Sequence, residues 1–248
     1  MGTLLPLVGL TTEYQRLMMS LNKRQPLLLV GPAGAGKTAV ISAVLNDLPT
    51  SLGVISSHCS SNLHQLLIHL ARALIKRDHA AFRLMAMPGN DPDKWLAKQT
   101  SIRLKGLLWS ALEVEPCPVV LDSVSNVGFP MYRFLQRLYF VRGMMFVAAA
   151  RDQLALGALR RLFWDPRNTV HLRRLNDAEA NQLFDLAVER FKIGYLDIGE
   201  FREKVIQSAK GNPGQIVEMC RLASNPAYIT GTHIKFAPLR IDALMRFL

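Results

Sequence analysis

The chain has 248 residues, half of them hydrophobic, and a formal net charge of +11 at pH 7. No apolar run approaches the roughly 18 to 20 residues that a membrane helix needs, so we expect a soluble protein with a sizeable core. The start of the chain lacks the basic segment and small-residue cleavage site of a secretory signal, which predicts a cytoplasmic protein.

Up to about residue 172, short apolar strands are expected to alternate with helices, which is the pattern of a parallel sheet. The run at 27–30 is wholly apolar, as expected of a strand buried on both faces. The other expected strands lie at 53–58, 119–121, 144–149 and 169–172. The expected helices lie at 12–22, 37–48, 62–77, 93–112 and 131–141, and 87–92 is expected to be a loop.

From Asp177 onward the pattern is helical, with Asn176 or Asp177 as the first cap. Helices are expected to end at Phe191 and to span 198–209 and 215–223, with a break at 211–214. The sequence therefore predicts an α/β domain over residues 1–175, a five-stranded parallel sheet with helices on both faces. A small helical lid domain with a short C-terminal extension is expected over residues 176–248.

Charge and cysteine content add two expectations. The basic excess lies in residues 1–175, whereas 176–248 contain nine basic and nine acidic residues, and an isoelectric point near 10.0 favours a polyanionic partner such as nucleic acid. No basic tail is present, so the folded surface would have to contact that partner. The scattered residues Cys59, Cys117 and Cys220 predict buried thiols rather than disulfides or a zinc site.

A glycine-rich segment between the first strand and the next helix fits the pattern G-x-x-x-x-G-K-S/T in full. Its residues are Gly31, Pro32, Ala33, Gly34, Ala35, Gly36, Lys37 and Thr38. Glycines let backbone N–H groups surround a phosphate, and the helix start adds partial positive charge there. The segment predicts a Walker A loop for ATP, with Lys37 on the β- and γ-phosphates and Thr38 on Mg²⁺. A turn that binds nothing would not require the Lys-Thr pair.

A carboxylate for the same Mg²⁺ is expected at the end of a neighbouring buried strand. The apolar run before Asp122 makes this residue the candidate Walker B acid, although an Asp that only caps a turn is the alternative. Most hydrolysing members of this class carry Glu or Asp at the next position to orient the attacking water, and here that position is Ser123. We therefore expect hydrolysis to be slow or to depend on a partner.

The order of Walker A, Walker B, an apolar strand ending in a polar residue, an arginine-bearing segment and a helical lid resembles the AAA+ and STAND class of P-loop ATPases. The resemblance covers about residues 10 to 223 and extends to origin-recognition ATPases and the AAA+ regulators of DNA transposition. It implies that Arg151, after the strand at 144–149, senses the γ-phosphate. The alternative is an arginine that only pairs with Asp152 or Asp122.

Three further sites follow from the resemblance or from charge. Arg160 or Arg161 lies where AAA+ proteins often place an arginine finger that reaches the next subunit, and a solvated basic face is the alternative. The turn at 211–214 resembles the GxP turn that packs near the adenine, which assigns Pro213 to the nucleotide, although a generic helix-to-helix turn would look the same. Arg133 and Arg137, four residues apart on one helix face, and Arg142 are candidates for DNA phosphates, for an acidic face of a neighbouring subunit, or for solvent.

Two functions fit these features. The first is an ATPase whose homo-oligomer, a ring or filament with nucleotide between subunits, assembles on duplex DNA, as in the regulation of transposition or replication-type assembly. The second is a STAND-type signalling ATPase that recruits protein partners without DNA. A metabolic kinase fits less well, because no acceptor-substrate site is recognisable. We favour the first, although residues 224–248 leave no room for a separate DNA-binding module.

Overall fold

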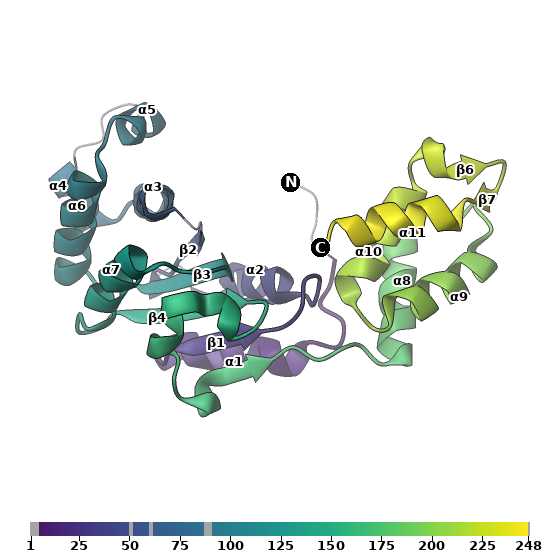
Figure 1. Ribbon diagram of the computed structural model, residues 1–248, viewed down its shortest axis with the longest axis horizontal. Helices are drawn as coiled ribbons and strands as arrows, with labels where there is room; N and C mark the ends of the chain where they lie inside the picture. Colours follow the sequence, from purple (N-terminus) through teal and green to yellow (C-terminus); the bar gives the residue numbers. More distant parts are fainter. Residues whose placement is uncertain (1–4, 50–51, 60–61, 87–90, 248) are drawn as a thin grey trace. The chain divides into compact units, whose positions relative to one another are not determined.

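The computed structural model describes residues 5–49, 52–59, 62–86 and 91–247 (Figure 1). The chain packs as two compact units. The sheet unit comprises Tyr14–Val30 and Ile41–His171, and the lid unit comprises the described residues of Met1–Glu13, Gly31–Val40 and Leu172–Leu248. The predicted domain boundary after residue 175 stays a prediction.

The sheet unit contains a five-stranded, wholly parallel sheet of order β2-β3-β4-β1-β5. Its strands are β1 (Leu27–Val30), β2 (Ile55–His58), β3 (Pro118–Val124), β4 (Met145–Ala150) and β5 (Thr169–His171). The adjacent residues Leu28 and Leu29, whose side chains point to opposite faces, are both fully buried, so both faces of the sheet are covered. The predicted α/β fold with helices on both faces is confirmed.

One face of the sheet shares a hydrophobic core with helices α3 (Leu63–Lys76), α4 (Ala80–Ala86), α6 (Ser101–Val114) and α7 (Phe129–Tyr139). Helix α3 packs against β2 and α6, and α4 packs against α6, as can be followed in Figure 1. The first helix is α1 (Thr11–Asn22), and two 3₁₀ segments, η2 (Leu154–Leu162) and η3 (Pro166–Asn168), precede β5.

The prediction of one helix at 93–112 is wrong, because two helices occupy this region. Helix α5 (Pro92–Ala97) is capped by Asp91, and α6 has its own cap, because the Thr100 side chain accepts a hydrogen bond from the Arg103 N–H. Helix α4 was not expected at all, and the loop expected at 87–92 lies mostly outside the described residues.

Strand β3 is longer than expected and passes through Asp122 instead of ending there. Its pairing with β4 shifts register between Leu121 and Val124, and Ser123 has a positive φ of 55°. Such a bulge turns side chains away from the regular alternation, and bulges recur beside functional sites.

The lid unit is built on α8 (Asp177–Phe191), α9 (Ile198–Ala209), α10 (Pro213–Ala223) and α11 (Phe236–Met245), which share one hydrophobic core. Asn176 caps α8 in a capping box with Glu179, and α9 has the predicted bounds. Helix α10 begins at Pro213, two residues earlier than expected. Where only a short extension was expected, the chain forms the turn η4 (Pro226–Tyr228), the hairpin of β6 (Ile229–Thr230) and β7 (His233–Ile234), and α11.

Among the described residues the three cysteines form no disulfide and are buried, as the sequence predicts. Burial raises the pKa of Cys59 to about 11 and that of Cys220 to about 12, so these thiols stay neutral near pH 7. Within the ranges that the structure describes, every helix is too short or too polar to cross a bilayer.

Candidate functional site

The glycine-rich loop leaves the buried strand β1 at Val30 and enters α2 (Lys37–Asp47). Gly34 and Gly36 have φ values of 78° and 96°, which non-glycine residues rarely adopt. The Lys37 ammonium donates to the carbonyl oxygens of Gly31, at 2.5 Å, and Pro32, at 2.8 Å. The lysine side chain therefore folds back over the loop that precedes it.

This loop fits a bound phosphate. The two positive-φ glycines alternate with residues of negative φ, and such a backbone turns successive N–H groups toward one point. The amino end of an eleven-residue helix follows at once, with Thr38 exposed in its first turn. The loop is also tightly packed, since a Cβ atom at Gly36 would lie 2.7 Å from Leu10 Cδ1. The residues present are those that an ATP phosphate with Mg²⁺ requires.

The lid turn is hydrogen-bonded to this loop within the lid unit. The Asn212 side-chain amide donates to the Ala33 carbonyl at 2.9 Å, and the Gly214 N–H donates to the Gly34 carbonyl at 2.8 Å. A Cβ atom at Gly214 would lie 2.6 Å from Gly34 Cα, so the two backbones are in contact. We call these two hydrogen bonds the lid latch. Pro213, between the two donors, lies beside the loop, since a Cβ atom at Gly36 would lie 3.8 Å from its Cγ. Its assignment to the adenine stays a prediction.

Asp122 is half-buried at the bulge of β3. Its Oδ1 accepts a hydrogen bond from the Ser123 N–H at 2.8 Å, and Ser123 is the residue with the positive φ. Val30 of β1 pairs with Ala150 of β4, which also pairs with Val124 of β3. The carboxyl ends of these three strands therefore meet at one edge of the sheet.

Arg151 follows the last residue of β4 at this same edge and is exposed. Asp152 is engaged elsewhere, because its Oδ1 accepts a hydrogen bond from the Ala155 N–H at 2.7 Å near the start of η2. The edge thus presents a carboxylate and a guanidinium, and the γ-phosphate-sensing role of Arg151 stays a prediction.

The two candidate finger arginines lie on η2 and differ in their contacts. Leu159 and Leu162 anchor this segment in the core, and both Arg160 and Arg161 are exposed. The Arg161 guanidinium lies 5.8 Å from the centre of the Tyr132 ring, a cation–π contact with α7.

Helix α7 has a basic face whose arginines lie over aromatic rings. Arg133 lies over the Phe129 ring and Arg137 over the Trp109 ring, each 4.6 Å from the ring centre, and Arg142 is exposed just beyond the helix. Helix α7 contains no acidic residue. The Phe129 contact could have been found from its helical spacing to Arg133. The Trp109 contact could not, because it joins two helices.

A known protein family matches most of this chain. Residues 6–189 match the family described as AAA ATPase domain. Among curated proteins, no match is found.

Solved structures match the fold over nearly the whole chain. Cdc6p from Pyrobaculum aerophilum has a TM-score of 0.65 at 15% identity, over 100% of this chain and 70% of that protein. The Orc1 protein from Aeropyrum pernix, in complex with DNA, has a TM-score of 0.64 at 17% identity, over 98% and 66% of the two chains. A STAND protein with a tetratricopeptide repeat sensor from Pyrococcus horikoshii has a TM-score of 0.52 at 16% identity, over 98% of this chain and 33% of that one. At these identities the likeness shows the fold alone.

Proposed function

Because this chain belongs to the AAA ATPase domain family, we propose that it is an ATP-controlled switch that assembles as a homo-oligomer on duplex DNA. AAA+ ATPases use ATP with a divalent metal, typically Mg²⁺. The cellular setting that we propose is cytoplasmic, in the regulation of DNA transposition or of a replication-type assembly.

Nucleotide control is supported by the lid latch. The loop assigned to the phosphates has two carbonyls, of Ala33 and Gly34, that accept hydrogen bonds from the lid turn. Because the latch holds the loop that would surround the phosphates, binding at the loop is coupled to the turn that starts α10. The lid therefore responds to occupancy of the loop, which a switch requires.

In the proposed chemistry, Lys37 pairs with the β- and γ-phosphates, and Thr38 and Asp122 hold Mg²⁺. Arg151 contacts the γ-phosphate and so distinguishes ATP from ADP. Ser123 lacks a carboxylate to orient water, so turnover is slow without a partner.

We assign the arginine finger to Arg160 rather than Arg161. Both arginines are exposed on the same anchored segment, but the Arg161 guanidinium already contacts Tyr132. An arginine that acts on the nucleotide of a neighbouring subunit makes hydrolysis depend on assembly. Arg160→Ala should therefore remove the rise in turnover with protein concentration, and Arg161→Ala should retain it.

The observation that carries the DNA proposal is the basic face of α7. Arg133 and Arg137 are exposed, and the rings of Phe129 and Trp109 hold their guanidinium groups in place. Pre-placed arginines lose less side-chain entropy when they bind phosphates, and the chain around them carries the basic excess. Two solved structures with this fold contain DNA, the Orc1 protein of Aeropyrum pernix and the origin recognition complex of Drosophila.

The test is binding of fluorescent duplex DNA with ATP, ADP or no nucleotide, read by anisotropy over a salt series. Arg133→Gln with Arg137→Gln should weaken ATP-dependent binding and reduce the slope of log K against log salt by about 0.9 per lost phosphate contact. The control removes two charges elsewhere, at Lys235 and Arg240, which are exposed in the lid unit. Equal weakening by both double variants would reduce the proposal to non-specific attraction, and wild-type protein that does not bind DNA with ATP would end it.

The alternative is a STAND-type signalling ATPase that recruits proteins without DNA. The Pro213 turn beside the loop and the likeness to the Pyrococcus horikoshii protein favour it. Light scattering with ATP and without DNA separates the two, because the alternative requires full oligomerisation in that sample.

A further inference from the structure

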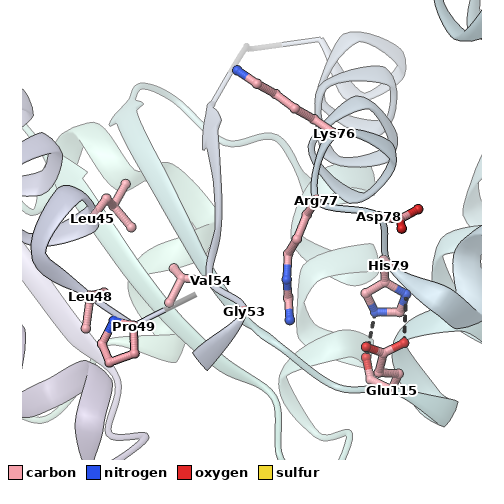
Figure 2. Close-up of a pocket in the computed structure, with 10 residues that line it drawn as sticks. All are labelled: Leu45, Leu48, Pro49, Gly53, Val54, Lys76, Arg77, Asp78, His79 and Glu115. Carbon is pink, nitrogen blue, oxygen red and sulfur yellow. Dashed lines mark hydrogen bonds and ion pairs between the residues drawn. The ribbon is translucent and has the colours of Figure 1, made fainter. Parts of the chain in front are cut away.

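A pocket of about 660 Å³ lies within the sheet unit at the amino ends of β2 and β3 (Figure 2). Its walls come from the carboxyl end of α2, from Gly53 and Val54 before β2, from the turn between α3 and α4, and from Glu115 before β3. The glycine-rich loop follows the carboxyl end of β1, so this pocket belongs to the opposite edge of the parallel sheet. Its volume is in the range of small-molecule sites.

The Arg77 side chain enters this pocket. Arg77 is the C-cap of α3, and Figure 2 shows its guanidinium directed toward the floor, between Gly53 and Glu115. The Nη1 atom is buried and has no hydrogen-bond partner among the residues that the structure describes. A buried hydrogen-bond donor without a partner is costly, and a bound ion or ligand is one explanation for such an atom.

Neither of the acids that line the pocket, Asp78 and Glu115, is within ion-pair distance of Arg77. Cys117 interacts with Arg77, but burial raises the pKa of this thiol to about 11, so it stays uncharged near pH 7. Asp78 pairs with Arg83, and Glu115 Oε2 lies 3.3 Å from His79 Nδ1. Glu115 also accepts a hydrogen bond from the Ala81 N–H at 3.2 Å.

The backbone provides space for the guanidinium at Gly53. A Cβ atom there would lie 1.3 Å from Arg77 Nη2 and 1.9 Å from its Cζ, so any other residue would displace the side chain. Gly53 also has a φ of 63°, which further disfavours a side chain. The guanidinium therefore occupies a place that the fold leaves for it.

The rest of the pocket lining indicates which chemical groups a ligand would carry besides the anion bound at Arg77. Leu45, Leu48, Pro49 and Val54 form an apolar wall that faces Arg77 across the pocket in Figure 2. Lys76 also lines the pocket, but in Figure 2 its side chain extends away from the Arg77 guanidinium. One guanidinium beside the Glu115 carboxylate favours a monoanion over a phosphate dianion.

We propose that this pocket binds a small organic monocarboxylate. The carboxylate pairs with the Arg77 guanidinium, whose planar fork matches two carboxylate oxygens, and the hydrocarbon part packs on the leucine-lined wall. This site is independent of the ATP and DNA proposals.

The probes are hexanoate and phenylacetate, with hexanol as the neutral analogue and inorganic phosphate as the dianion. Calorimetry and thermal shift are measured on the full chain with ATP and Mg²⁺ in excess, so that phosphate is not read at the glycine-rich loop. At least one carboxylate should bind and raise Tm, whereas hexanol and phosphate should not. If neither carboxylate binds at millimolar concentration, the proposal is wrong.

Arg77→Leu should weaken carboxylate binding at least ~10-fold, because a charge-assisted hydrogen-bonded pair is lost. The ligand-free variant should be no less stable than wild type, since an uncompensated buried charge is removed. A purely structural arginine would give the reverse, a lower Tm and unchanged binding. Arg72→Leu, five residues earlier on α3 and exposed beside Asp93, is the matched control and should leave binding intact. Gly53→Ala should weaken binding by moving the guanidinium, and unchanged binding in that variant would also contradict the proposal.

Discussion

Asn212 has two roles that substitutions can separate. It caps α10, and it forms one of the two latch hydrogen bonds to the glycine-rich loop. Its Oδ1 accepts the Gln215 N–H at 3.2 Å as the N-cap of α10, and its Nδ2 donates to the Ala33 carbonyl at 2.9 Å. Asn212→Ser keeps a capping oxygen but removes the donor, which costs about 1 kcal/mol of folding free energy for one hydrogen bond. Asn212→Ala removes the cap as well and should cost about 2 kcal/mol in all.

The latch should also affect nucleotide affinity, because it holds the loop in its positive-φ conformation before ATP binds. Loss of about 1 kcal/mol of this preorganisation weakens ATP binding by up to about fivefold. The assay is urea unfolding for stability and calorimetry for ATP. The control is Asn176→Ala, which removes the cap of α8 but touches no loop carbonyl. If Asn176→Ala and both Asn212 variants bind ATP like wild type, the latch does not act on the nucleotide.

Three further results are expected. Lys37→Ala should abolish binding of ATP in calorimetry while leaving the circular dichroism spectrum intact, and residual binding would contradict the assignment of the phosphate loop. Ser123→Glu should raise ATP turnover in a phosphate-release assay, and an unchanged rate would show that the missing acid does not limit hydrolysis. The Arg173 guanidinium and the Asn176 N–H hold the pKa of Glu179 at about 2, below its usual 4.5. The folded pKa is depressed, so this stabilisation is present above about pH 4.5 and is lost as pH falls toward 2. Arg173→Gln should therefore lower stability at pH 7 more than at pH 3, as measured by urea unfolding.

The sheet could be predicted from the sequence because each central strand is a short apolar run, and burial on both faces requires such a run. The elements that the sequence analysis missed have local causes. The break before α6 depends on the Thr100 side chain, which competes with a sequence of good helix formers around Lys98 and Gln99. The hairpin of β6 and β7 has strands of two residues, too short to show any alternation.

In the candidate site, too, local features could be predicted from the sequence and long-range contacts could not. The glycine-rich loop is a contiguous motif, so its position and conformation could be predicted from eight residues. The latch could not, because Asn212 and Ala33 are 179 positions apart and their approach depends on how the lid unit packs. The cation–π contact of Arg137 with Trp109 likewise joins two helices, and the spacing on either helix gives no sign of it.

Arg77 shows why a pocket without a motif escapes sequence analysis. In the sequence it is the last residue of an amphipathic helix, where a basic side chain is expected to face solvent and favour the helix dipole. The fold instead places a glycine beneath it and buries its Nη1, without a hydrogen-bond partner among the described residues, opposite apolar side chains. Each residue is unremarkable alone, so the chemistry exists only in their three-dimensional arrangement. Carboxylate binding at this site would therefore be a test of the packing around Gly53, because no sequence motif predicts it.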